Sequence, residues 1–166
     1  MINKINKLSQ SEFIKVFANI FENSAWIAEE LYKQKPFYNF EELSLKILDI
    51  FENASKKKQV VILIAHPDLA DKTKISSLTP DSRKEQANVG LDQCTEEEFK
   101  EFKSLNEKYK KKFGFPFIYA VKNKSKNEIL SNFRQRLTYD ISVEFNEAIK
   151  QVKKIASLRL NKINEK

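Results

Sequence analysis

Apolar side chains recur at three- and four-residue spacing along most of the chain, which is the period of an α-helix with one buried face. The stripes run through Phe13 to Phe21, Leu43 to Phe51, Phe99 to Phe113, Ile129 to Ile141 and Phe145 to Ala156. Only two glycines and four prolines occur, too little turn chemistry for a many-stranded sandwich or barrel. The pattern predicts an all-α protein: a single compact multi-helix domain over residues 1–166, with about seven to eight helices.

Residues that favour helix starts stand where the stripes begin. A Ser or Thr three residues before a Glu can form a capping box, in which each side chain satisfies a backbone N–H of the other residue. The pairs are Ser9 with Glu12, Thr95 with Glu98, and Ser125 with Glu128, and Thr79 before Pro80 is a fourth start. We expect breaks at Pro36, Pro67, Gly90 and the turn from Gly114 to Pro116.

One segment conflicts with this scheme. Val60 to Ile64 reads Val-Val-Ile-Leu-Ile, which is typical of a strand. A single strand would have no partner in an otherwise helical chain. We therefore predict a buried helix here, with packing overriding local propensity.

Composition excludes several classes of protein. One cysteine, Cys94, and one histidine, His66, are too few for a disulfide framework or an ordinary zinc site, so we expect no metal. The N-terminal residues lack the apolar run of a signal peptide, and the longest apolar stretch is too short to span a bilayer. We expect a soluble, cytoplasmic protein without a membrane partner.

The charge balance does not predict a nucleic-acid partner. There are 30 Lys and Arg against 23 Asp and Glu, a net charge of +7. The lysines occur in short groups such as Lys56 to Lys58 and Lys110 to Lys112, with Glu and Asp residues between the groups, as on solvated helix faces, and no known nucleic-acid-binding motif accompanies them. Nucleic-acid binding stays an alternative, and it predicts a binding affinity that falls steeply as the salt concentration rises.

His66 is the first candidate for chemistry, because a lone imidazole can move a proton near neutral pH. Pro67 disfavours helical geometry at the residue before it, so the chain should turn at His66. A buried structural histidine is the alternative.

The second candidate is the helix start that carries Ser82, Arg83, Lys84, Glu85 and Gln86. A spacing of three puts Ser82 and Glu85 on one face, beside first-turn N–H groups that can bind a carboxylate or carbonyl. The alternative is a capping pair of Ser82 and Glu85, with Gln86 exposed.

The third candidate is the apolar segment that follows the Gly114 to Pro116 turn. It comprises Phe117, Ile118, Tyr119, Ala120 and Val121. A bend built on Gly and Pro can leave backbone groups available to bind the edge of a flat heterocycle. A core linker is the alternative.

Taken in order, these motifs resemble one family. The chain carries Ile64-Ala65-His66-Pro67-Asp68-Leu69-Ala70, Ser82-x-x-Glu85-Gln86, Gly90-Leu91, Leu105-Asn106 with Tyr109, Phe113-Gly114-Phe115-Pro116-Phe117 and Arg136-Leu137. It resembles the 2-oxo-4-hydroxy-4-carboxy-5-ureidoimidazoline (OHCU) decarboxylases of urate breakdown over essentially its whole length.

The resemblance implies an all-helical homodimer that needs no cofactor and converts OHCU to (S)-allantoin. It implies a catalytic role for His66, with Pro67 at the border of the substrate. The family's Ser-x-x-Glu-Gln turn falls on Ser82 to Gln86, its bend on Phe117 to Val121, and its late arginine on Arg159.

Our hypothesis makes His66 the general acid/base. Glu85 would bond the substrate hydroxyl or hold the His66 tautomer, and Arg159 would bind the carboxylate or a ring carbonyl. The turn from Ser82 to Gln86 and the bend from Phe117 to Val121 would hold the ring and the ureido group.

The chain departs from the family's usual residues at two positions. Asp71 stands where Gly is usual, and Val89 where Ala is usual. Asp71 could change the backbone of the His66 loop or repel an anionic substrate. The alternatives are a related decarboxylase for another small ring acid and a catalytically silent helical ligand-binding protein.

Overall fold

The structure, a computed structural model, describes residues 1–165 and is all-helical in that range, as predicted. Those residues form nine α-helices and one 3-10 helix, and none is in a strand. The helix count exceeds the expected seven to eight because short helices such as α1 (Ile2–Lys7) contain too few turns to show a period. No helix among these residues combines the length and apolar character that crossing a membrane requires.

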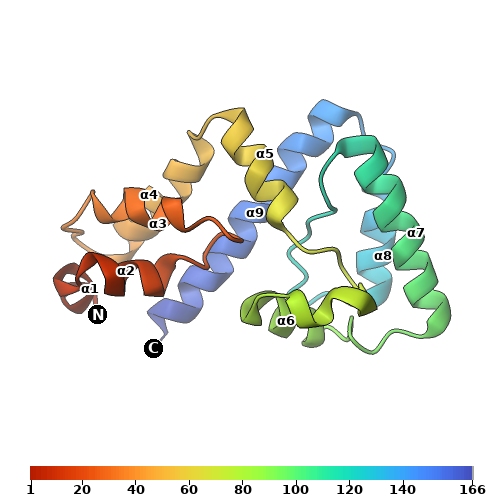
Figure 1. Cartoon of the computed structure of the whole chain (residues 1–166), viewed down its shortest axis with the longest axis horizontal. Coiled ribbons are helices and arrows are strands. Elements are labelled where there is room, and N and C mark those ends of the chain that lie inside the picture. Colours follow the sequence, from red (N-terminus) through yellow and green to blue (C-terminus); the bar gives the residue numbers. More distant parts are fainter. Residues whose placement is uncertain (166) are drawn as a thin grey trace. The chain divides into compact units, whose positions relative to one another are not determined.

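The chain divides into two compact units. The terminal unit contains residues 1–65 together with the chain from residue 152 onward, and the central unit contains residues 66–151. The long helix α9 (Ile141–Asn164), blue in Figure 1, contributes its first part to the central unit and its last part to the terminal unit. The expectation of one domain over residues 1–166 stays a prediction.

The terminal unit is built mainly from short helices. These are α1, α2 (Gln10–Phe17), α3 (Ala25–Tyr32), α4 (Phe40–Glu52), α5 (Lys56–Ala65) and the end of α9. Helix α3 packs against α2 and α4. The core includes residues of the two predicted apolar stripes, Phe13, Phe17, Leu43, Ile47 and Phe51, together with Leu31 of α3, which no predicted stripe contained. The capping box of Ser9 and Glu12 starts α2 as predicted.

Helix α5 contains the strand-like segment from Val60 to Ile64, so the prediction of a helix there is confirmed. The prediction that this segment is buried is wrong for part of it. Ile62 and Leu63 are buried, whereas Val61 and Ile64 are 58% and 56% exposed. The reason is geometric, because successive helical side chains point in different directions and five consecutive residues cannot share one face.

The central unit contains the 3-10 helix η1 (Lys72–Ser77), α6 (Pro80–Ala87), α7 (Glu96–Phe113), α8 (Lys126–Arg136) and the first part of α9. Helix α7 packs against α8. The remaining three predicted starts are confirmed: both capping boxes are formed, and Thr79 caps α6 with Pro80 at its first position. Gly114 ends α7 in the left-handed region, with φ +80°, a conformation that favours glycine.

An aromatic cluster fills the core of the central unit. The rings of Phe117 and Phe133 are stacked, with centroids 3.9 Å apart. The Tyr109 ring meets both of them edge-on. The cluster fixes the start of the segment from Phe117 to Val121, which the sequence singled out as a candidate for ligand binding.

A buried polar triad lies beside this cluster. Glu144 accepts hydrogen bonds from the Tyr109 hydroxyl and from Arg136, whose Nε lies 2.8 Å from Glu144 Oε1. Arg136 Nη1 donates to the Ile118 carbonyl at 2.6 Å. All three triad side chains are essentially inaccessible to solvent. Burial, reinforced by the Glu144 carboxylate, raises the pKa of Tyr109, so the phenol stays a donor.

Candidate active site

His66 lies in the loop that connects α5 to η1. The helix ends at Ala65, as Pro67 predicts, and the His66 side chain is buried. The loop from His66 to Asp71 has no regular secondary structure. Side chains from two other helices hold its backbone.

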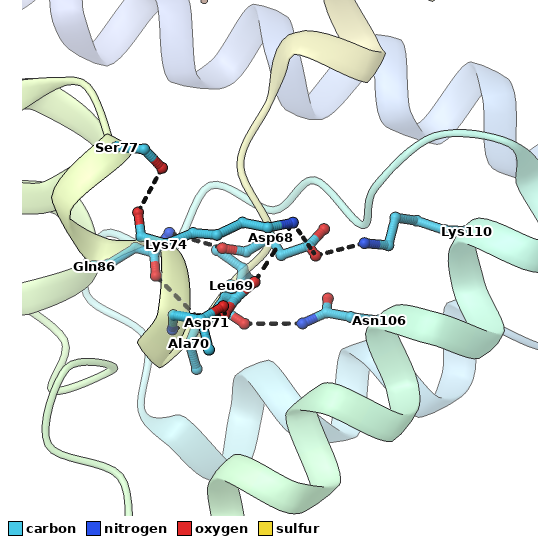
Figure 2. A network of polar contacts seen from close by, with 10 residues as sticks. Asp68, Leu69, Ala70, Asp71, Lys74, Ser77, Gln86, Asn106 and Lys110 are labelled. Carbon is cyan, nitrogen blue, oxygen red and sulfur yellow. Dashed lines mark hydrogen bonds and ion pairs between the residues drawn. The ribbon is translucent and has the colours of Figure 1, made fainter.

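Gln86 of α6 bridges the loop on one side (Figure 2). Its Oε1 accepts from the Ala70 N–H at 3.0 Å, and its Nε2 donates to the Asp68 carbonyl at 3.2 Å. The Gln86 amide therefore accepts one hydrogen bond from the loop backbone and donates another to it, as a backbone peptide group of an adjacent strand does. The alternative of an exposed Gln86 is wrong, because the side chain is buried.

Helix α7 holds the other side of the same loop (Figure 2). Asn106 Nδ2 donates to the Leu69 carbonyl at 3.0 Å. Lys110 Nζ lies 2.6 Å from Asp68 Oδ2 and forms an ion pair with this buried carboxylate. Sequence reasoning missed both as candidate residues. For Asn106 the sequence did contain a signal, because this polar residue stands between the core positions Leu105 and Tyr109. The sequence contained no such signal for Lys110.

The loop also contains backbone strain. Ala70 has φ +54°, in the left-handed region that a residue with a Cβ rarely occupies. Such a conformation costs about 1–2 kcal/mol in an L-residue. The hydrogen bond from the Ala70 N–H to Gln86 helps to hold it there.

Asp71, which stands where the resemblance leads us to expect glycine, caps the 3-10 helix that follows. Its Oδ1 accepts from the Thr73 N–H at 3.0 Å and from the Thr73 hydroxyl at 2.7 Å. Partial burial alone would raise the pKa of Asp71, but these two bonds and nearby Lys74 lower it overall. The carboxylate thus has a local structural role in this chain.

Helix α6 presents its candidate residues to different environments. Ser82 is buried and Glu85 is half-buried, whereas Arg83 and Lys84 are exposed. Arg83 Nη2 donates to the Ser76 carbonyl at 3.1 Å. The alternative that Ser82 caps this helix is wrong, since the cap is the Thr79 side chain.

The bend from Phe117 to Val121 is less open than the sequence suggested. Phe117, Ile118 and Val121 are buried, while Tyr119 and Ala120 are half-buried. The Ile118 carbonyl is bonded by Arg136, and the Ala120 N–H donates to Gln151 Oε1 at 3.0 Å. These two backbone groups therefore already have partners within the chain.

Arg159 belongs to the terminal unit, where it is buried and ion-paired. Its Nη2 lies 2.8 Å from Glu22 Oε1, and its Nη1 donates to the Asn19 carbonyl at 3.0 Å. Both charged side chains are at least nine-tenths buried. That Arg159 acts together with His66 stays a prediction.

A cavity of about 410 Å³ adjoins the loop on the α7 side, lined in part by Asp68, Ala70, Asn106 and Lys110. None of the predicted site residues lines it. Among residues 1–165, no group of three or more His, Cys, Asp or Glu side chains is placed to hold a metal ion.

Comparison with known proteins decides the family. The family model described as OHCU decarboxylase matches residues 6–161. The chain belongs to the OHCU decarboxylase family. This confirms the family resemblance drawn from the motifs, whereas the site roles that the resemblance gives to the His66 loop, α6 and the bend after α7 stay predictions.

Individual relatives agree. An OHCU decarboxylase of Haloferax volcanii is 36% identical over 159 residues, covering 96% of this chain and 93% of the relative. A uric acid degradation bifunctional protein of Bacillus sp. (strain TB-90) is 39% identical over 162 residues, covering 98% of this chain. The present chain spans only 32% of that bifunctional protein.

A solved structure shares the fold. The crystal structure of an (S)-allantoin synthase superposes with a TM-score of 0.78 at 29% identity, covering 98% of this chain and 53% of that one. The all-helical OHCU decarboxylase fold expected from the sequence is therefore present.

Proposed function

We propose that this protein is a carboxy-lyase that converts OHCU to (S)-allantoin in urate breakdown, without a cofactor. The observation that carries the proposal is the loop from His66 to Ala70. It presents the chain's only histidine, buried, in the family's His-Pro-Asp-Leu-Ala motif. The family match over residues 6–161 supports the substrate class.

The reaction is feasible without an added electron acceptor, because the substrate contains one. When the bond to the carboxylate breaks, carbon dioxide leaves and the electron pair forms a double bond to the adjacent ring carbon. The electrons of that carbon's C=N bond move onto nitrogen, which takes up a proton. Protonation of the ring carbon and loss of the hydroxyl proton then give allantoin, so the protein must orient the ring and deliver a proton to one face.

His66 is the general acid/base in this proposal and supplies the proton to the ring carbon. Glu85 bonds the substrate hydroxyl or holds the working tautomer of His66. Arg159 binds the carboxylate or a ring carbonyl through its planar guanidinium. Ser82 and Gln86 contact the ring and the ureido group.

The remaining contacts come from exposed or loop residues. Pro67 borders the substrate, and the bend from Phe117 to Val121 packs against the ring. Arg83 and Lys84 line the same turn as Ser82, where their positive charges attract the anionic substrate. A homodimer in the cytoplasm completes the proposal, and light scattering should give twice the 19.5 kDa of one chain.

Circular dichroism at an allantoin-sensitive wavelength tests the function. OHCU is unstable, so it is generated in situ from urate by urate oxidase and hydroxyisourate hydrolase. It decays unaided to racemic allantoin, and optical activity is therefore the informative signal. We expect the wild type to give one enantiomer rapidly.

His66→Gln tests the catalytic assignment in the same assay. Loss of a positioned acid typically slows the reaction about 100- to 10,000-fold. Near-normal turnover by His66→Gln would contradict the role of His66. Optical activity no higher than the uncatalysed control for the wild type would contradict the proposed activity and favour a silent ligand-binding protein or a different ring acid as substrate.

A further inference from the structure

The loop that carries His66 depends on side chains for its shape. It has no backbone ladder of its own, and three of its backbone groups pair with side chains of α6 and α7. The left-handed Ala70 means that the isolated segment would prefer another conformation. Removing the contacts should therefore let the loop relax.

Asn106 is an unusual residue for its position. It is 5% exposed and stands on the buried face of α7 with Phe102, Leu105 and Tyr109. A buried amide is unfavourable unless it is hydrogen-bonded. Its Nδ2 bonds the Leu69 carbonyl, while its Oδ1 is buried and has no partner among residues 1–165. Packing alone would favour an apolar residue at this position. We therefore attribute the presence of an amide to its hydrogen bond with the Leu69 carbonyl of the loop.

Lys110 stands one helical turn after Asn106, on the same face of α7. Its Nζ reaches Asp68 Oδ2 at 2.6 Å, and the Asp68 side chain is only 8% exposed. Lys74 is a more distant partner of the same carboxylate, at 3.9 Å. Asn106 and Lys110 thus hold the consecutive loop residues Leu69 and Asp68 (Figure 2).

We propose that Asn106 and Lys110 are positioning residues that hold the His66 loop in its working geometry. They act through Leu69 and Asp68 and need not touch the substrate. This inference rests on the proposed function of His66 as the general acid/base. A displacement of about 1 Å at a reacting group can slow a reaction about 100-fold, so loss of either contact should lower kcat about 10- to 100-fold with little change in KM.

Two variants remove the contacts and keep side chains of similar length and branching. Asn106→Leu removes the donor to Leu69 and also the unpartnered oxygen. Lys110→Met keeps the unbranched chain and removes the charge. Lys110→Arg keeps a cation near Asp68 and should recover most of the lost kcat.

Matched controls come from the same unit. Asn132 of α8 is half-buried, and its Oδ1 is buried without a partner among residues 1–165, so Asn132→Leu controls for the loss of an amide with an unpartnered oxygen. Lys126 pairs with Glu98 at 2.9 Å, and Lys126→Met controls for the loss of an ion pair to α7. Both controls should keep kcat within about twofold.

Proton NMR gives a readout that does not depend on activity. His66 is the only histidine, so a protein without an affinity tag shows one set of imidazole resonances. We expect these resonances to shift or broaden in Asn106→Leu and Lys110→Met and to keep their positions in both controls. The proposal is overturned if both test variants keep the imidazole resonances and the kcat of the wild type. It is also overturned if the test variants lose thermal stability but keep their kcat, because the contacts would then be only structural.

The two proposals fail in different ways. If the wild type makes no optically active allantoin, the proposed function fails, and the imidazole resonances still test the contacts of Asn106 and Lys110. If the wild type is active and the resonances and kcat of the test variants match those of the controls, only the positioning role fails.

Discussion

The buried triad of Tyr109, Arg136 and Glu144 allows a stability prediction that follows from its contacts. Tyr109→Phe removes one donor from the Glu144 carboxylate and leaves the two contacts from Arg136 in place. A hydrogen bond to a charged group contributes about 1.5–3 kcal/mol. The aromatic contacts of the ring are kept, so we expect Tyr109→Phe to lower the free energy of unfolding by about 2 kcal/mol.

Glu144→Gln is the more severe change. It leaves the Arg136 guanidinium buried, 1% exposed, without an ionised partner. Removing one member of a buried ion pair costs about 3–5 kcal/mol. In a chain of this size each kcal/mol lowers Tm by about 2–4 °C. We therefore expect Tm to fall roughly 4–8 °C for Tyr109→Phe and further for Glu144→Gln.

Urea unfolding followed by circular dichroism measures both free energies, and Tyr38→Phe is the matched control. Tyr38 is 88% exposed, so its replacement should change stability by less than about 0.5 kcal/mol. The reasoning is refuted if Tyr109→Phe is as stable as this control. It is also refuted if Glu144→Gln is no less stable than Tyr109→Phe.

Three further predictions concern the loop, a helix start and pH. Ala70→Gly relieves the strain of the left-handed backbone and should raise the free energy of unfolding, measured in urea, by up to about 1 kcal/mol. A lower free energy of unfolding would contradict the claim that Ala70 is strained. Ser125→Ala removes the capping box of α8 and should cost about 1 kcal/mol, whereas Ser131→Ala within the same helix should cost less. Asp71→Ala should cost about 1 kcal/mol at pH 7. Because folding lowers the pKa of Asp71, its contribution is present above the usual value of 3.8 and is lost as the pH falls below it, so the stabilities of variant and wild type should converge in acid.

Local sequence determined the helical character of the chain and the starts of α2, α6, α7 and α8. A capping box needs only two residues three positions apart, so the pairs at α2, α7 and α8 could be predicted without any tertiary contact. The motif order likewise determined the family, and with it the candidate residues from His66 to Arg159. Local sequence did not determine which residues of an apolar run are buried. Val61 and Ile64 are apolar like core residues, yet both are exposed on α5.

The tertiary structure decided which polar side chains meet. Asn106 and Lys110 bond a loop 37 and 42 residues earlier in the chain, and no local period encodes a contact at that separation. Gln86 pairs with the same loop, and Arg136 occupies the Ile118 carbonyl that the sequence left open for a ligand. Helical periodicity records only whether a position faces the core, whereas a buried polar group requires a specific partner, which only the packed chain supplies.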